Sequence, residues 1–412
     1  MNDRTRNYLV FLANPAVFGL GFHLVSPVTI LPVFVSFLTD SNVLIGAIPP
    51  FVQLAFALPL IYGARYFEPR PYKVPQLVLI STAGRVVFLA FGGFVILADG
   101  RPAALLLGLF FVALFAFRAT NGFAYIAWAE AFSKIVHPQT RGRLMGVAQA
   151  LAEALAGAGV LIATRLMGDE PFPVGFGIVI IVAMLIMTSS HGLLLLLKES
   201  PSPPMAADLR PIWSAGARIP RLLRGDPAFR RLILARLLVG YGMTSFGFFA
   251  VFATRNFDLG LEQIGLLTTV LLVTQTAATF GSGFLNDRLG PVRLAAAGGL
   301  VVLVAAVLAA TATDPVAFYA IFVCVGISQS AFTIADFTLV LEAAPTEQMT
   351  TYLATYNVAI APLLLPAALA AGYLADVAGF RPMFIVSAAL AVAGIALMMR
   401  LSRRRPARTA RG

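Results

Sequence analysis

Twelve long apolar stretches dominate this sequence of 412 residues. A helix needs roughly 20 predominantly apolar residues to cross a bilayer, and each stretch is about that long. A transmembrane β-barrel is excluded because its strands alternate in polarity over only about 10 residues. The sequence therefore predicts an all-α integral membrane protein with twelve transmembrane helices. The predicted spans are approximately 15–38, 43–66, 74–97, 102–130, 144–167, 173–197, 231–254, 261–285, 294–313, 315–341, 350–375 and 382–400.

The composition agrees with a hydrocarbon environment. Hydrophobic residues make up 59% of the chain and charged residues only 12%, against about 25% charged residues in soluble domains. A charge in the middle of a bilayer costs at least about 2.5 kcal/mol. The net charge of +11 lies mainly in short loops and tails, where it contacts lipid headgroups rather than nucleic acid.

The distribution of basic residues predicts the orientation. Most Lys and Arg residues fall in the N-terminus, the loops that follow even-numbered spans, and the C-terminal tail. The positive-inside rule then places both termini in the cytoplasm. The exceptions are Arg85, Arg118 and Arg236 within spans, and Arg101, Arg165, Arg255 and Arg381 on the opposite side.

A Pro-rich, basic segment at 198–230 separates two groups of six spans. It predicts a cytoplasmic linker between an N-terminal bundle, 1–197, and a C-terminal bundle, 231–412, that ends in a basic tail. Residues after the second span reappear after the eighth at an offset of 220, which indicates duplicated, pseudo-symmetric halves. The matching sets are Gly63, Pro71 and Lys73, and Gly283, Pro291 and Arg293.

Several classes of chemistry have no motif in this chain. We find no phosphate-binding loop, no His-Glu-x-x-His metal motif and no Ser or Cys nucleophile motif. Cys324 is the only cysteine, so no disulfide can form within the chain. The sequence predicts neither an enzyme nor an ATP-driven pump, and it predicts no metal or cofactor. The absence of an Asn-x-Ser/Thr sequon favours a bacterial inner membrane.

The segment after the eighth span reads Gly283-Phe-Leu-Asn-Asp287-Arg288-Leu-Gly290-Pro-Val-Arg293. It is similar to motif A of the major facilitator superfamily, Gly-x-Leu-Ala-Asp-Arg-x-Gly-Arg-Lys. A carboxylate beside an arginine at a helix end can accept charge-assisted hydrogen bonds, and glycines permit close helix approach. We interpret the segment as a gating latch; the alternative is a solvated turn.

The fourth span reads Leu114-Phe-Ala-Phe-Arg118-Ala-Thr-Asn121-Gly122. It resembles motif B of the same superfamily, Leu-x-x-x-Arg-x-x-Gln-Gly, with Asn121 in place of Gln. The resemblance implies two six-helix bundles, with spans one, four, seven and ten lining a central cavity. It also implies a link between the motif B arginine and proton coupling. Subfamily signatures of antiporters and sugar porters are missing.

Two spans carry polar stripes, because helical spacing places their polar residues on one face. The resemblance implies that both stripes face the substrate path. In the fourth span the stripe is Arg118, Asn121, Tyr125 and Trp128, and in the tenth it is Gln329, Thr333 and Asp336.

Intramembrane ionisable residues are candidates for function. Arg118 needs a partner, and Glu153 in the fifth span is predicted to supply it, either for coupling or as a static ion pair. Asp336 has no evident partner in the sequence and is a candidate proton carrier, unless it is hydrated near a helix end. His23 in the first span can titrate near neutral pH or serve as a helix contact.

Two further charge contacts are expected. Glu130 is predicted to pair with Lys134, four residues later, and Arg236 to reach the membrane surface with its charged end.

These patterns favour a monomeric secondary transporter that moves a small organic solute by alternating access. Proton coupling and efflux of an amphipathic compound are our preferred interpretation, because phenylalanines crowd the fourth and seventh spans. A cation-coupled nutrient symporter remains an alternative. A transporter-like receptor or lipid-handling protein is another.

Overall fold

The computed structural model describes residues 3–67, 70–98, 102–136, 138–169, 172–199, 201, 220, 222–343 and 349–404. Every regular element in these ranges is helical, as predicted. The elements are α1 (Asp3–Leu24), α2 (Ile30–Ser36), α3 (Asn42–Phe67), α4 (Val74–Leu97), α5 (Ala103–Ile135), α6 (Pro138–Asp169), α7 (Val174–Leu194), α9 (Pro227–Gly242), η1 (Met243–Ser245), α10 (Phe246–Phe257), α11 (Leu261–Leu289), α12 (Pro291–Thr311), α13 (Ala317–Ala343), α14 (Met349–Ala378) and α15 (Phe380–Arg404).

Within the described ranges, twelve helical segments are long and apolar enough to cross a membrane, which confirms the predicted number of spans. The first span differs from its prediction. Its helix runs from Asp3 to Leu24 and stops before a break that precedes α2, whereas the sequence predicted one span over 15–38. Pro27 cannot donate a backbone hydrogen bond, and the Ser26 hydroxyl accepts one from Val28 N–H at 3.3 Å. Local turn chemistry therefore interrupts the helix within the apolar run.

The seventh span also begins earlier than predicted. Asp226 caps α9 by accepting hydrogen bonds from the N–H groups of Ala228 at 3.0 Å and Phe229 at 2.9 Å. Pro227 occupies the first turn, where its missing N–H is tolerated. The predicted linker, 198–230, therefore overlaps the start of α9, and its residues 202–219 lie outside the described ranges.

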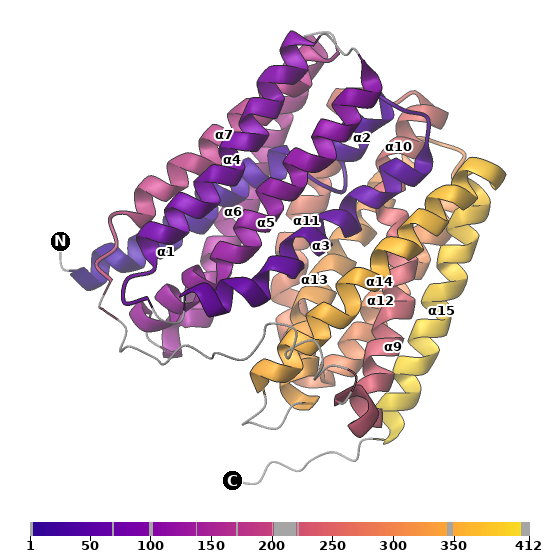
Figure 1. The fold of residues 1–412 in the computed structure, drawn as a ribbon. Coiled ribbons are helices and arrows are strands. Elements are labelled where there is room, and N and C mark those ends of the chain that lie inside the picture. The colour runs from indigo at the N-terminus through magenta and orange to yellow at the C-terminus, as the bar shows by residue number, and fades with distance from the viewer. Residues whose placement is uncertain are drawn as a thin grey trace. The chain divides into compact units, whose positions relative to one another are not determined.

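The helices form two compact units (Figure 1). Unit 1 comprises Met1–Asp40, Phe51–Ile212 and Leu259–Leu272, and unit 2 comprises Ser41–Pro50, Trp213–Asp258 and Val273–Gly412. In unit 1, α1 packs against α6 and α7, and α4 packs against α5 and α7. In unit 2, α12 packs against α13 and α15, and α15 also packs against α9. Two helices, α3 and α11, are divided between the units.

The first residues of α3 belong to unit 2 through specific contacts. The backbone N–H of Asn42 donates a hydrogen bond of 2.8 Å to the Asp376 carboxylate. Gly372 has no side chain, which lets α14 approach the backbone of Asn42 and Val43. The first residues of α11 belong to unit 1 in a similar way, since the Thr269 hydroxyl donates to the Gly157 carbonyl at 3.1 Å.

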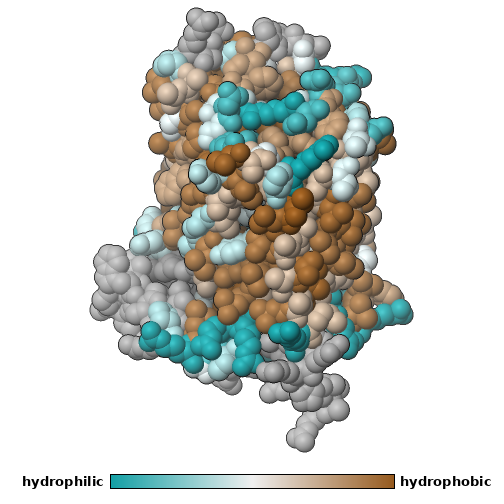
Figure 2. Space-filling model, turned by 90° about the vertical axis from the view of Figure 1, so that its right-hand side faces the viewer, coloured by the Kyte–Doolittle hydropathy of each residue, from teal (hydrophilic) through white to brown (hydrophobic). Residues whose placement is uncertain are grey.

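One face of the molecule shows how polarity is distributed (Figure 2). Hydrophobic residues dominate the middle of this face, and hydrophilic residues gather towards its upper and lower ends. Large apolar side chains of α14 and α15 remain exposed, among them Tyr373, Val377, Ile385 and Val392. A soluble monomer rarely exposes so many large apolar side chains together. This surface fits contact with lipid.

Candidate functional site

A buried charge cluster in unit 2 joins three helices. Asp336 of α13 forms a bidentate ion pair with Arg236 of α9, with Nε–Oδ1 at 2.8 Å and Nη2–Oδ2 at 3.0 Å. The Tyr356 hydroxyl of α14 donates a further hydrogen bond of 2.6 Å to Asp336 Oδ1. Parallel N–H···O bonds of this kind fix both distance and orientation.

This cluster corrects two predictions. Asp336 is not unpaired, because Arg236 and Tyr356 both bind its carboxylate. Arg236 does not extend to the membrane surface, since the residue is only 8% exposed and its guanidinium lies 4.3 Å from the centre of the Phe332 ring. The sequence did carry a signal for this pair, because an arginine and an aspartate each interrupt an apolar span.

The other two residues of the predicted α13 stripe make different contacts. Thr333 is exposed, and its hydroxyl donates to the Gln329 carbonyl at 2.8 Å within the same helix. Gln329 is half-buried. The two residues share a side of α13 with Asp336, as their spacing predicts, but no hydrogen bond among the described residues joins them to its cluster.

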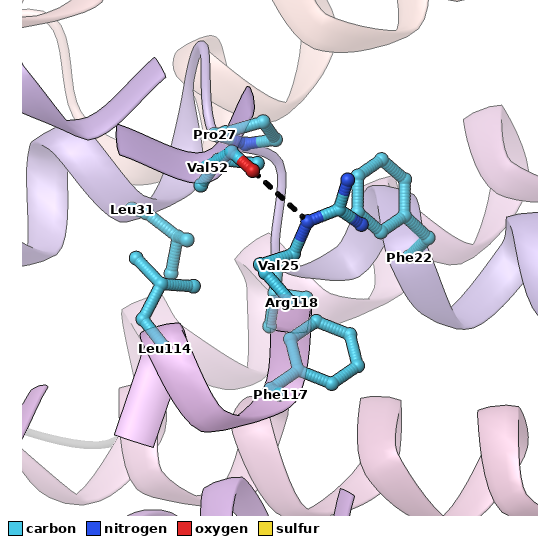
Figure 3. Close-up of a pocket in the computed structure, with 8 residues that line it drawn as sticks. All are labelled: Phe22, Val25, Pro27, Leu31, Val52, Leu114, Phe117 and Arg118. Carbon is cyan, nitrogen blue, oxygen red and sulfur yellow. Dashed lines mark hydrogen bonds between the residues drawn. The ribbon is translucent and has the colours of Figure 1, made fainter. Parts of the chain in front are cut away.

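Arg118 of α5 lies at a small pocket in unit 1 (Figure 3). Its Nε donates a long hydrogen bond of 3.5 Å to the Val52 carbonyl of α3. Its Cζ lies 5.0 Å from the ring centres of both Phe22 and Phe56, within the range of cation–π attraction. The pocket walls are otherwise apolar and comprise Phe22, Val25, Pro27, Leu31, Val52, Leu114 and Phe117.

The rest of the predicted α5 stripe continues from Arg118 through aromatic contacts. Tyr125 lies against Phe56, with ring centres 5.6 Å apart, and stacks on Trp128 at 6.0 Å. Trp128 Nε1 donates to Asn14 Oδ1 of α1 at 3.2 Å. Asn121 instead donates to the Phe117 carbonyl of its own helix at 2.7 Å.

Close contact between α3 and α5 positions the α5 stripe. A Cβ atom at Gly122 would overlap the Phe56 carbonyl oxygen, and one at Gly63 would overlap the Phe123 carbonyl oxygen. Glycine at these positions lets the two backbones touch. The motif B glycine therefore has a packing role that brings Phe56 and Val52 to Arg118.

The predicted ion pair between Arg118 and Glu153 is absent from the described contacts. Glu153 is buried in α6, where Gln149 Nε2 donates to its Oε1 at 2.8 Å. Arg118 turns instead towards α1 and α3. Proximity in sequence suggested the wrong partner, because the residues that surround Arg118 come from helices earlier in the chain.

The histidines have different surroundings. His23 is half-buried, and its ring contacts Phe22 at 5.8 Å. Sequence reasoning missed His191 of α7, which is buried with Nε2 3.0 Å from the Ser81 hydroxyl and Nδ1 2.7 Å from the Thr82 hydroxyl. Both ring nitrogens thus have partners, which favours a role in packing α4 against α7.

The motif A residues lie at the junction of α11 and α12. Asp287, Arg288 and Arg293 are exposed, and the Arg288 guanidinium lies over the Phe284 ring at 4.1 Å. Gly290 has φ +78°, a conformation that favours glycine. A Cβ atom at Gly283 would meet open space. The expected close helix approach at Gly283 is therefore not present in this structure.

A further charge cluster lies at the start of α4. Lys73 is buried and its ammonium pairs with Glu130 of α5. The Glu199 carboxylate accepts the N–H groups of Lys73 at 2.9 Å and Val74 at 3.1 Å. Glu130 was predicted to pair with Lys134, whose side chain lies outside the described part of the chain. The pair with Lys134 therefore stays a prediction, and Lys73 is a partner of Glu130 that the sequence did not indicate.

No group of three or more His, Cys, Asp or Glu side chains within the described ranges is arranged to hold a metal ion.

Comparison with known proteins identifies the class. The family model of the Major Facilitator Superfamily matches residues 77–359 and 232–412. The chain belongs to this superfamily, so it is an integral membrane transporter of small molecules and not an enzyme. No curated protein matches the sequence significantly.

Solved structures share the fold at low sequence identity. A mutant of the nucleoside transporter NupG matches with a TM-score of 0.74 and 11% identity, covering 97% of this chain and 100% of that one. A bacterial homolog of the human lysosomal transporter Spinster matches with a TM-score of 0.71 and 16% identity, covering 98% of each chain. The human organic anion transporter MFSD10 matches with a TM-score of 0.66 and 15% identity, covering 97% of this chain and 100% of that one.

Proposed function

We propose that this protein moves a small amphipathic organic compound across the membrane by alternating access, coupled to protons and in the direction of efflux. The observation that carries the proposal is the cluster of Asp336, Arg236 and Tyr356 within the spans of unit 2. Intramembrane carboxylates of this kind commonly mark proton or ion pathways. The pocket beside Arg118 has apolar walls and one cation, which suits an amphipathic substrate.

The chemistry of the cluster supports proton coupling. A proton on Asp336 removes the negative charge that holds Arg236, and α9, α13 and α14 then lose a shared ionic contact. Proton binding thereby favours rearrangement of these helices. The solved structures with the same fold include transporters named for nucleosides, for organic anions and for iron, so the preference for an organic substrate rests on the apolar pocket.

The test is transport in proteoliposomes under an imposed pH gradient. A mixture of anionic, neutral and cationic amphipathic compounds is added, and mass spectrometry identifies those that accumulate relative to protein-free vesicles. We expect Asp336→Asn to keep counterflow of the same compound and to lose its accumulation. Asp314→Asn changes an exposed carboxylate in the loop before α13 and is the matched control.

The alternatives predict other results. Accumulation that follows a sodium gradient and ignores pH indicates a cation-coupled symporter. Binding without counterflow of any compound indicates a receptor or lipid-handling protein. If Asp336→Asn still concentrates its substrate with a normal pH response, Asp336 is structural, and His23 or Glu153 becomes the proton site to test.

We further propose a monomer in the bacterial inner membrane with both termini and the 198–230 linker in the cytoplasm. The concentration of basic residues on that side supports this orientation. Single cysteines in the linker and at Asp314, introduced after replacement of Cys324, should be labelled from opposite sides. Labelling from one side would contradict the proposed topology.

The motif A segment is proposed to act as a gating latch. Asp287 is exposed in this structure, so Asp287→Asn should leave stability unchanged while slowing turnover strongly. Normal turnover in this variant would identify the segment as a turn only.

A further inference from the structure

The two units differ in how their buried arginines are neutralised. In unit 1, Arg118 is 9% exposed and Arg85 is 3% exposed. Within the described part of the chain, no carboxylate lies within ion-pair distance of either guanidinium. In unit 2, Arg236 is neutralised by Asp336. Burying a cation in a low-dielectric site without a counter-ion costs free energy. Arg118 and Arg85 therefore need either a bound anion or strong contacts within the protein.

The surroundings of Arg118 hold the guanidinium through weak contacts only. Phe22 and Phe56 contact it through their rings, and Val52 accepts one long hydrogen bond from Nε. The two terminal nitrogens make no hydrogen bond to any described residue. Figure 3 shows the guanidinium next to the Phe22 ring, above the apolar wall that Leu114 and Phe117 contribute.

Arg85 makes one hydrogen bond and one ring contact, and its buried Nε has no hydrogen-bond partner among the described residues. Its Nη1 donates to the Met187 carbonyl, and its Cζ lies 5.4 Å from the Phe18 ring centre. Phe18 and Phe22 stack on the same side of α1 with ring centres 6.0 Å apart. The rings that Arg85 and Arg118 contact therefore lie about one helical turn apart on α1, and the charge of Arg85 adds positive potential to this part of unit 1.

We propose that the pocket beside Arg118 binds the acid group of an amphipathic organic anion, a carboxylate or a phosphate. A guanidinium presents N–H donors in a planar fork that matches both groups. The bound acid supplies the negative charge that the described surroundings of Arg118 lack, while the apolar walls contact the body of the molecule. This inference rests on the proposed transport function and specifies its substrate class.

The acid could belong to a soluble compound or to an anionic lipid, since both present the same group to Arg118. The test uses the full chain in nanodiscs of phosphatidylcholine. The probes are four compounds on one phenylalkyl skeleton, which carry a carboxylate, a phosphate, an amide or an amine. We expect one or both acids to bind the wild type at least about tenfold more tightly than the amide and the amine, as charge-assisted hydrogen bonds imply.

Variants assign the preference to Arg118. Arg118→Gln should lose the preference for acids, and Arg118→Lys should retain part of it, because the charge remains while the fork is lost. Arg165→Gln removes an arginine whose side chain is 75% exposed and should bind like the wild type. The Lys variant also shows whether loss of binding in the Gln variant comes from misfolding.

The proposal is overturned if neither acid binds the wild type, if the amide or amine binds as tightly, or if Arg118→Gln keeps the preference.

Nanodiscs that also contain phosphatidylglycerol distinguish a lipid from a soluble anion as the source of the acid group. If the lipid is the natural occupant, phosphatidylglycerol should weaken binding of the acid probes. Native mass spectrometry should then find phosphatidylglycerol bound to the wild type and absent from Arg118→Gln. Unchanged binding identifies a soluble anion. Counterflow of the bound probe tests transport separately, so an anion site without counterflow refutes only the transport proposal.

Discussion

Arg118 in unit 1 and Arg236 in unit 2 are the same residue type, both buried within membrane spans, yet their surroundings differ. Arg236 meets a bidentate carboxylate that Tyr356 also binds. Arg118 meets one distant carbonyl and two aromatic rings. In unit 2 the counter-charge belongs to the protein. In unit 1 the counter-charge is, in our proposal, brought by the substrate.

The difference should be visible in stability as well as in binding. Two cation–π contacts and a 3.5 Å hydrogen bond compensate Arg118 only in part. The pair in unit 2 is fully formed, and breaking a buried ion pair leaves a charge without compensation. Removing each arginine therefore tests the comparison directly.

The largest effect is expected for Arg236→Met. It leaves Asp336 half-buried without its cation, which should cost about 3 kcal/mol of unfolding free energy. Arg236→Met with Asp336→Leu should recover much of that loss, because neither charge remains. Apparent melting temperatures of the single and the double variant, measured in the same detergent, test both expectations. Equal loss in the single and double variants would mean that the ion pair does not stabilise unit 2.

A somewhat smaller effect is expected for Gly122→Ala. The added methyl group would overlap the Phe56 carbonyl oxygen and force α3 away from α5, at a cost of about 2 kcal/mol. Gly108→Ala on the same helix meets open space and is the matched control. If acid binding survives a destabilised Gly122→Ala variant, the position of Phe56 is not critical for the Arg118 site.

Tyr356→Phe should have an intermediate effect. It removes one hydrogen bond to a charged group, worth about 1.5 kcal/mol, and leaves the ion pair in place. Tyr373→Phe, at a residue that is 64% exposed, should not change the melting temperature. A loss as large as that of Arg236→Met would show that Tyr356, rather than Arg236, is the main partner of Asp336.

The smallest change in stability is expected for Arg118→Met without ligand. Since no carboxylate is left unpaired, the unfolding free energy should stay within about 0.5 kcal/mol of the wild type or rise. A large loss that Glu153→Gln restores would contradict the structure and support an ion pair between Arg118 and Glu153. Comparison with Arg236→Met separates the two kinds of arginine site.

The number of spans and the all-α class follow from long apolar runs, because hydrocarbon imposes the same requirement along the whole chain. The break after Leu24 depends on Ser26 and Pro27, a local feature that a hydropathy average hides. Pairing of Arg236 with Asp336 joins residues 100 positions apart, so it depends on helix packing. The partners of Arg118 include the backbone of Val52, for which side-chain patterns carry no signal.

The hydrogen bond between Asn42 and Asp376 has a consequence for biosynthesis. The two residues are 334 positions apart, and ribosomes add about 5–20 residues per second. The beginning of α3 therefore waits roughly 20–70 s after its own synthesis for its final partner. During that interval a nascent chain of this protein carries an incompletely packed helix end. A chain terminated before Gly372 would keep α3 in that state and present it to the quality-control proteases of the membrane.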